Sequence, residues 1–524
     1  TPDSETKKAA AILSSLVGKH TQWRGADFPV YYNRVPTNGH FFVFATNSSR
    51  PAFLNDLPMV EGPQIFMMDA PESRSDKMLV IAGRDEADLV LAAKALASED
   101  LVLIGDKLRI QDFKESPERQ AYDAPNWVPI DETIAFSRIM QYPGQLTSRG
   151  YAPPPVHMPM SIAPDLYMVG TGGLDVNLKY RYTKPEGGDQ AQLRMRINNY
   201  LIDSVNLSSQ SSSGVREMRL PSFNGPLATS PSEALALAAQ NDLSFEVVYR
   251  RELSEGSPDN CKSVVLLPHQ MEIDPASTMT LNGLFHYAEM PNLTLFTQSA
   301  YPYSVYADLS RTAVVIPKEA SAEKVTTLLN TMARIASVTG AVATKLTVVD
   351  QASEAALDGK DILFIGEMPI TLPDFKKENA EELQNAIANS LKGEEVLQPE
   401  EVLFSPDGGV GAIVSLQSPF DSDRTVVAFL SEGQSGSYLL NEQLKSPSSM
   451  KTVAGAVAII NEQSIVDFKV GDTYSIGDLP WYHKIWESMS NYPLLLVLCA
   501  LICAVLVGTG IFYFMRLWVR GRAK

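Results

Sequence analysis

The sequence is poor in the residues that build disulfide frameworks and metal centres. Its 524 residues include three cysteines and six histidines. Cys499 and Cys503 lie in an apolar segment near the C-terminus, which leaves Cys261 alone in the rest of the chain. Cys261 is then either a small buried residue or the partner of a cysteine on another polypeptide. The histidines show neither HExxH nor paired Cys/His spacing, so we predict no metal site.

Positive charge is also scarce. The chain has 44 lysines and arginines against 61 aspartates and glutamates, which gives a formal net charge of −17. Nucleic-acid binding depends on clustered basic residues, and the sequence contains no such stretch. We therefore predict that nucleic acid is not a partner.

Motifs for nucleotide binding and for catalysis are missing as well. The loop that follows Ile316 is acidic and lacks glycine, unlike the phosphate-binding loops of doubly wound domains. No GxSxG motif is present. Asp421-Ser422-Asp423 has the form of a sugar-nucleotide transferase motif, but we interpret it as a polar turn. We predict no catalytic residue, no cofactor and no enzymatic activity.

A long uncharged run is present near the C-terminus. Pro493 to Phe514 contains 22 residues without a charge. At about 1.5 Å per residue, a helix of this length spans the roughly 30 Å hydrocarbon core of a bilayer. The segment that follows is basic, which places it on the cytoplasmic side. We predict a transmembrane helix over 493–514, a cytoplasmic tail over 515–524, and all preceding residues outside the cytoplasm.

The segment before this run, 479–492, has the pattern of an amphipathic helix. Its apolar residues recur at spacings of three and four, and its aromatic side chains suit the interface between lipid and water. We predict a helix that lies in the plane of the membrane surface. Its docking residues for membrane or partner are Trp481, Ile485, Trp486, Met489 and Tyr492.

Two parts of the chain repeat one plan. Residues 312–317, 320–338 and 345–350 read as a β-α-β unit, and residues 1–32 match its later two thirds, with 28–32 as the second strand. Residues 65–96 in turn match 413–444. We predict two doubly wound α/β domains, 1–140 and 308–475. Because the first copy lacks an opening strand, we expect a C-terminal fragment whose missing strand either comes from another polypeptide segment or is not included in this sequence.

The region between the two copies has a different pattern. Short alternating runs are separated by clusters of glycine, serine and proline, and a proline-rich linker over 152–159 leads into them. This pattern favours antiparallel strands with one buried face. We predict a jelly-roll β-sandwich over 151–300.

The predicted sandwich also contains candidates for sugar binding. Sugars place their apolar faces on aromatic rings and direct their hydroxyls at planar polar groups. The alternative is that half of the tyrosines face the core. The predicted carbohydrate-binding residues are Tyr180, Tyr182, Arg194, Arg196, Asn199 and Tyr200.

Several runs resemble the B subunit of bacterial cellulose synthase, and the resemblance covers essentially the whole chain. They are RGADFPVYYNRVP (24–36), YDAPNW (122–127), QSPFDSDR (417–424) and LPWYHKIW (479–486). This family alternates carbohydrate-binding-like jelly rolls with flavodoxin-like domains in the periplasm. The resemblance therefore implies flavodoxin-like α/β domains flanking a carbohydrate-binding-like sandwich, held in the bacterial inner membrane by one C-terminal helix.

The resemblance also implies a function and partners. The expected partners are the catalytic A subunit, nascent cellulose, membrane lipid, and other copies of the chain or other synthase subunits. The C-terminal anchor would dock on and support the catalytic subunit, while the periplasmic domains guide the nascent β-1,4-glucan. The alternative is a membrane-bound periplasmic carbohydrate-active enzyme, which would need two carboxylates about 5 to 10 Å apart in a cleft.

The family is also described as binding cyclic di-GMP. Arg516 and Arg520 have RxxxR spacing, but they follow the apolar run directly and no DxSxxG motif accompanies them. We interpret both as cytoplasmic flanking charge. Cyclic di-GMP is therefore expected to act on the complex through the catalytic subunit.

Overall fold

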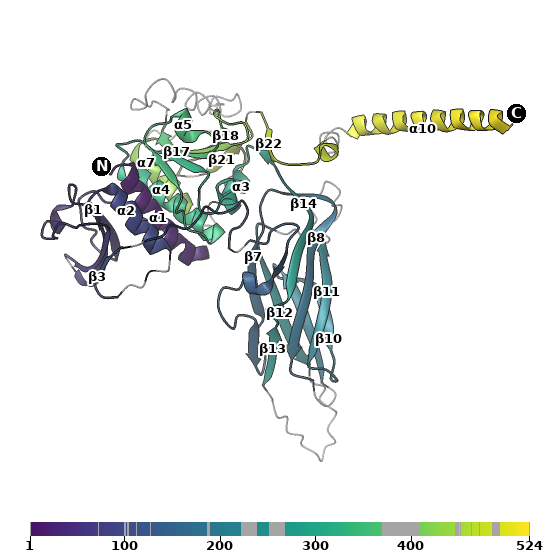
Figure 1. Ribbon diagram of the computed structural model, residues 1–524, viewed down its shortest axis with the longest axis horizontal. Coiled ribbons are helices and arrows are strands. Elements are labelled where there is room, and N and C mark those ends of the chain that lie inside the picture. Colours follow the sequence, from purple (N-terminus) through teal and green to yellow (C-terminus); the bar gives the residue numbers. More distant parts are fainter. Residues whose placement is uncertain are drawn as a thin grey trace, which may run out of the picture.

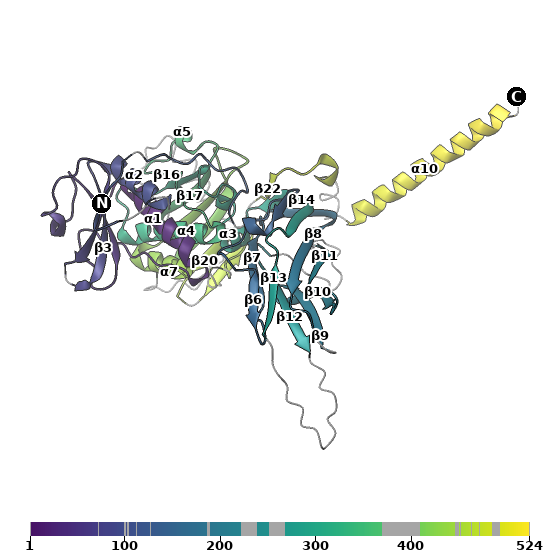
Figure 2. The ribbon, with the colours of Figure 1, turned by 60° about the horizontal axis from the view of Figure 1, so that its bottom comes forward.

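The computed structural model describes residues 2–522 except 72, 99–100, 102–103, 112, 126, 186–188, 222–237, 251–267, 369–408, 446–449, 451, 463, 471 and 485–492. Two α/β domains lie side by side, and a β-sandwich extends from the second of them (Figure 1). A long C-terminal helix projects away from these domains, as the second view also shows (Figure 2).

The second α/β domain is built on a seven-stranded sheet with the order β16-β15-β17-β19-β18-β20-β21. β15, β16, β17 and β19 run parallel, and β18 is antiparallel to both of its neighbours. Its strands are β15 (Thr312–Val315), β16 (Thr347–Val349), β17 (Asp361–Glu367), β18 (Gly411–Gln417), β19 (Thr425–Ser431), β20 (Val457–Ile460) and β21 (Ile465–Phe468). Its helices are α3 (Leu293–Ser299), α4 (Ala322–Thr339), α5 (Glu354–Leu357) and α7 (Gly433–Lys445). The central strands are continuous apolar runs because both faces of the sheet are covered.

The first α/β domain has a four-stranded sheet with the order β1-β3-β2-β4. Its elements are α1 (Ser4–Thr21), β1 (Phe41–Thr46), β2 (Gln64–Ala70), β3 (Ser73–Gly83), α2 (Glu86–Ala97) and β4 (Lys107–Arg109). β1 is parallel to β3, and β2 is antiparallel to β3 and β4. This is the pairing of β17, β19, β18 and β20 in the second domain, so the repeated plan is confirmed at the level of strand pairing.

One prediction for the first copy is wrong. Residues 28–32 do not form a strand. The backbone N–H groups of Phe28 and Val30 instead donate to Asn330 Oδ1 at 2.9 Å and to Thr326 Oγ1 at 3.2 Å. The segment lies along α4 of the other domain, so side chains of that helix satisfy the backbone groups that a sheet neighbour would otherwise satisfy.

The sandwich consists of two antiparallel sheets. One has the order β10-β9-β12-β7, and the other has β14-β8-β13-β6 with β11 paired to β8, β5 to β14 and β22 to β14. The strands are β5 (Thr133–Ala135), β6 (Thr147–Gly150), β7 (Val156–Ser161), β8 (Leu166–Tyr182), β9 (Gln190–Ile197), β10 (Tyr200–Leu207), β11 (Ser213–Pro221), β12 (Gln240–Arg250), β13 (His269–Ile273), β14 (Thr278–Met290) and β22 (Tyr474–Gly477). Short 3-10 turns occur at Gln22–Arg24, Ala52–Leu54, Phe136–Arg138 and Tyr303–Val305. Inward side chains of both sheets form one core, as the alternating sequence pattern predicts.

The C-terminal part begins with β22 and ends with α10 (Pro493–Arg522). Among the residues described, no helix combines the length and the apolarity required to cross a bilayer. Trp481 begins a helical turn and is 73% exposed. Of the other predicted docking residues, Ile485, Trp486, Met489 and Tyr492 lie outside the described residues, as does Cys261.

Candidate functional site

Two of the predicted sugar-binding residues are in the core of the sandwich. Tyr180 and Tyr182 are 7% and 6% exposed, and their ring centroids lie 6.0 Å apart. Because a buried ring cannot stack on a sugar, the prediction is corrected for these two residues. The signal was present in the sequence, since a period of two along β8 puts both tyrosines on the face of buried Leu174, Val176 and Leu178.

The other four candidates are accessible but not gathered around one point. Arg194 and Arg196 alternate with buried residues along β9 and therefore share the outer face of the four-stranded sheet. Arg196 pairs with Glu246 at 2.6 Å. Asn199 is exposed in the turn between β9 and β10, and Tyr200 follows it with 67% exposure. The structure brings the two arginines together, and contact of these four residues with glucan stays a prediction.

A buried polar cluster, which we call the sandwich junction, joins the sandwich to the second α/β domain. The hydroxyl of Tyr122 donates to Asp165 Oδ2 at 2.5 Å, and His286 Nδ1 lies 3.1 Å from Asp165 Oδ1. The Tyr122 and His286 rings stack with centroids 3.5 Å apart, and Asp165 is 2% exposed. Burial, and next the charge of Asp165, raise the pKa of Tyr122 far above its usual value. Tyr122 therefore remains a proton donor to the carboxylate.

The YDAPNW segment provides the other side of this junction. The N–H of Tyr122 donates to the carbonyl of Val305 in the second α/β domain at 2.7 Å. Trp127 is buried and packs in a small cluster with Ala124, Ala163 and other alanines. This segment thus fixes the sandwich on the α/β domain, a role that its sequence alone does not reveal.

The C-terminal segment is attached to the same region. β22 pairs with β14 of the sandwich, and the hydroxyl of Tyr474 lies 2.9 Å from that of Thr425 in the second α/β domain. The N–H of Asp478 donates to the carbonyl of His286 at 3.0 Å. Residues 474–478 therefore contact both domains just before the chain continues toward α10.

Doubly wound domains bind ligands at one edge of the sheet. The residues described at this edge of the second α/β domain form ionic contacts. Such ligands bind at the carboxyl ends of the strands, where the strand order reverses, which here means after β15 and β17. Lys7 of α1 donates to the carbonyls of Pro317 and Lys318 at 2.8 and 3.0 Å, and Lys324 pairs with Glu367 at 2.5 Å. Burial lowers the pKa of Lys7. These two ammonium groups are thus already hydrogen-bonded within the protein.

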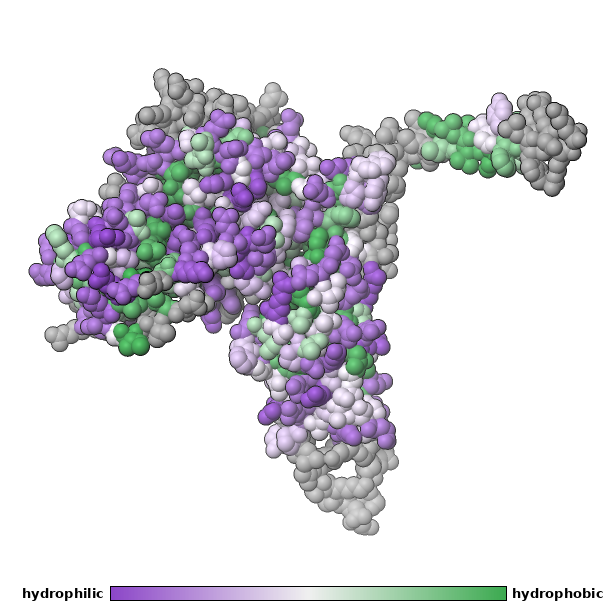
Figure 3. Space-filling model, in the orientation of Figure 1, coloured by the Kyte–Doolittle hydropathy of each residue, from purple (hydrophilic) through white to green (hydrophobic). Residues whose placement is uncertain are grey.

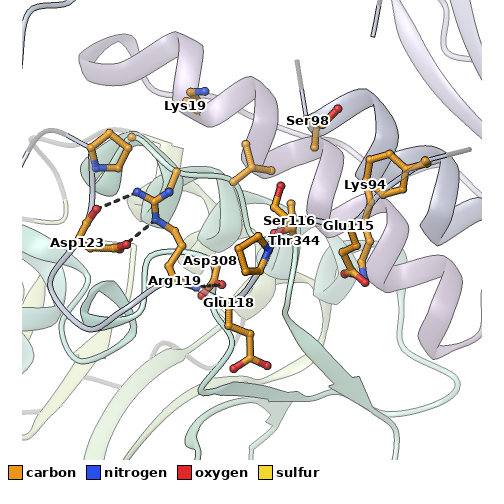
Figure 4. A pocket seen from close by; sticks show the side chains of 17 residues that line it. Lys19, Lys94, Ser98, Glu115, Ser116, Glu118, Arg119, Asp123, Asp308 and Thr344 are labelled. Carbon is orange, nitrogen blue, oxygen red and sulfur yellow. Dashed lines mark hydrogen bonds and ion pairs between the residues drawn. The ribbon is translucent and has the colours of Figure 1, made fainter. Parts of the chain in front are cut away.

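A cavity of about 380 Å³, the interdomain pocket, opens between the two α/β domains (Figure 4). It lies at the C-terminal ends of α1, α2 and α4 and is bordered by residues of the segment 113–125. Its lining residues are Lys19, Lys94, Ala97, Ser98, Phe113, Glu115, Ser116, Pro117, Glu118, Arg119, Asp123, Pro125, Asp308, Gly340, Ala341, Val342 and Thr344. Sequence reasoning missed the pocket because these residues come from separate segments with no common motif.

Charges of opposite sign are paired within the pocket. Glu115 accepts a hydrogen bond from Lys94 and lies 3.1 Å from Lys345. Figure 4 shows Arg119 reaching Asp123, with a Nε–Oδ1 distance of 3.0 Å. The hydrogen bond from Lys94, together with Lys345, lowers the pKa of Glu115, so this carboxyl is ionised and unsuited to act as a general acid. Across the described residues, no group of three His, Cys, Asp or Glu side chains could hold a metal ion.

An antiparallel sandwich joined to two related α/β domains defines a multidomain protein whose polar sites are junctions and a pocket. Family models agree with this division. Residues 1–110 match "Cellulose synthase BcsB, first FD domain", 133–278 match the second CBM domain of the same family, and 286–429 match its second FD domain.

Curated relatives cover nearly the whole chain. The cyclic di-GMP-binding protein of Salmonella typhi is 35% identical over 99% of this chain and 70% of its own length. The protein of the same name from Escherichia coli K12 is 34% identical over 99% and 69%, and that from Komagataeibacter xylinus is 26% identical over 96% and 66%. The chain therefore belongs to the BcsB family of cellulose synthase subunits.

Proposed function

We propose that this chain is a non-catalytic subunit that is anchored in the bacterial inner membrane. Its C-terminal segment docks on and supports the catalytic A subunit, and its folded domains guide the nascent β-1,4-glucan across the periplasm. Lipid, glucan and the catalytic subunit are the partners, and copies of the chain or other synthase subunits complete the complex.

The observation that carries this proposal is the apolar character of α10. Its described side chains are exposed, and its described large apolar residues, Val497 and those from Leu501 to Met515, are each more than half exposed. Figure 3 shows this helix as an apolar projection from a largely hydrophilic body. An exposed apolar surface of this extent calls for lipid or a protein partner to cover it.

The sequence around α10 supports a single crossing with a defined direction. Residues 493–514 carry no charge, and the basic tail 515–524 follows them. Exposed Trp481 and Tyr482 precede the helix and suit the periplasmic interface. The large N-terminal part then lies in the periplasm and the tail in the cytoplasm.

A scaffold role for the folded domains is the second part of the proposal. Residues 133–278 match a family carbohydrate-binding module, which supports glucan as the ligand of the sandwich. We keep the three predicted domains (1–140, 151–300 and 308–475) but propose shifted bounds, because β5 and β6 pair with strands of the sandwich and α3 packs in the core of the second α/β domain. We also propose that both α/β domains are flavodoxin-like in fold, and that the second binds no phosphate, since Lys7 and Lys324 are already hydrogen-bonded within the protein at the edge that would hold it.

Cyclic di-GMP, which gives several relatives their name, is proposed to act through the catalytic subunit. The arginines with RxxxR spacing, Arg516 and Arg520, belong to the basic tail that follows the apolar run. This reading predicts that the isolated chain binds cyclic di-GMP far more weakly than the complex does.

Two measurements on the purified chain test the proposal. Affinity purification of the intact chain from cells that make the catalytic subunit should recover that subunit, whereas a variant ending at Gly477 should not. Incubation of the intact chain with β-1,4-glucan should release no new reducing ends. Release of reducing ends that grows with protein concentration would establish the carbohydrate-active enzyme instead.

A further inference from the structure

We propose that the interdomain pocket binds a neutral saccharide of the cello-oligosaccharide class. The choice of sugar rests on the proposed function, because a subunit that guides β-1,4-glucan meets this polymer. The pocket itself is assigned from its size, its charge and its mixture of polar and apolar groups.

Size and position suit a small ligand. Pockets for small molecules commonly measure about 300 to 1,000 Å³ and occur at domain interfaces, and this one measures about 380 Å³. It lies between α2 of the first α/β domain and the end of α4 in the second. A ligand here would contact both domains and the segment that leads to the sandwich.

The charges of the pocket exclude a phosphate ligand. Glu115 is shared by Lys94 and Lys345, and Arg119 is held by Asp123. The main-chain N–H of Arg119 also donates to Asp308 Oδ2 at 2.8 Å. The carboxylates thus neutralise these cations. The helix C-termini at the pocket add partial negative charge, which further disfavours an anion.

The uncharged groups match a sugar. Ser116 and Thr344 supply hydroxyls that both donate and accept hydrogen bonds. Phe113, Pro117 and Pro125 provide apolar walls for the CH faces of a pyranose ring. This combination recognises a polyhydroxylated ligand without a net charge.

The first test is binding of cellotetraose to the intact chain in detergent, followed by calorimetry. Ser116→Leu should weaken binding at least about tenfold, because Ser116 is an exposed lining residue and leucine narrows the pocket. Ser422→Leu, at an exposed serine elsewhere on the second α/β domain, is the matched control and should leave the affinity unchanged. Equal affinity in both variants, or no binding to the parent chain, would overturn the proposal.

The second test addresses charge. Glu115→Gln leaves Lys94 and Lys345 without their shared carboxylate, so the pocket should gain measurable affinity for inorganic pyrophosphate, which the parent chain should not bind. Pyrophosphate binding by the parent chain would contradict the neutral-ligand assignment. Affinity purification of the Ser116→Leu chain separates the pocket proposal from the proposed function. Loss of the catalytic subunit from this purification would count against the proposed function rather than against the pocket.

Discussion

Two junctions hold the domains of this chain together, and different kinds of interaction stabilise them. Between the α/β domains, α1 lies so close to α4 that a Cβ added to Gly18 would come within 2.1 Å of the carbonyl oxygen of Ala333. At the sandwich junction, one buried carboxylate, Asp165, is held by Tyr122 and His286. The first junction is fixed by shape, whereas the second is fixed by a few hydrogen bonds.

This difference predicts which contact between domains is rigid and which depends on individual hydrogen bonds. Gly18 and Ala333 meet backbone to backbone without a titrating group, so pH should not alter this contact between α1 and α4. The sandwich and the C-terminal segment are attached through phenol, imidazole and carboxyl groups. Their attachment to the α/β pair should therefore respond to single hydrogen-bond deletions.

The largest effect should come from Gly18→Leu, which breaks the helix junction. The added side chain would overlap the backbone of Ala333, so α1 and α4 must separate. We expect a loss of about 3 kcal/mol or more in the free energy of unfolding, measured by urea titration. Gly62→Ala, where a Cβ has open space, should change it by less than about 0.5 kcal/mol. Equal values for both variants would contradict the close contact.

The free energy of unfolding should depend on pH through Asp361, which lies beside the sandwich junction. Burial raises the pKa of Asp361 to about 6 despite Arg424, 3.3 Å away. Between about pH 4 and pH 6 the unfolded chain releases this proton first, so stability falls as pH rises. The fall should be about 3 kcal/mol relative to Asp361→Asn, which does not titrate, in urea titrations across this range. A constant difference between the two chains would show that Asp361 is ionised throughout.

The phenol at the sandwich junction should contribute less. Tyr122→Phe removes the hydroxyl donor of a buried carboxylate, which we expect to cost about 2 kcal/mol. Tyr151→Phe, at an exposed tyrosine, is the control and should be neutral. Limited proteolysis should also show faster cleavage between the sandwich and the α/β pair in Tyr122→Phe alone. Unchanged stability and cleavage would mean that the rings, not the hydrogen bond, hold the junction.

The smallest effect is expected for Lys7, the polar contact within the shape-determined junction. Lys7→Met removes two hydrogen bonds to carbonyls, but it also removes a buried charge, so the net loss should be about 1 kcal/mol. Lys8→Met removes only a surface pair with Glu5 and should be neutral in the same titration. A loss as large as that of Gly18→Leu would show that this junction, too, depends on hydrogen bonds.

The elements with strong local patterns were predictable. The repeat predicted a helix over 320–338 and the structure has Ala322–Thr339, because an apolar face and a serine cap define it locally. The strand predicted over 28–32 was wrong, since α4 captures this segment through tertiary contacts that no local pattern encodes. Within the candidate site, the outward orientation of Arg194 and Arg196 could be predicted from the alternating pattern of β9. The pocket could not be predicted, because separate chain segments converge to form it.

The most direct test is glucan synthesis in vesicles that contain the catalytic subunit, with three forms of this chain: intact, ending at Gly477, and 478–524 alone. We predict that the intact chain and the terminal segment both restore synthesis, whereas the form ending at Gly477 does not. Synthesis restored by the form that ends at Gly477, with the terminal segment inactive, would contradict a subunit that supports catalysis through its membrane anchor.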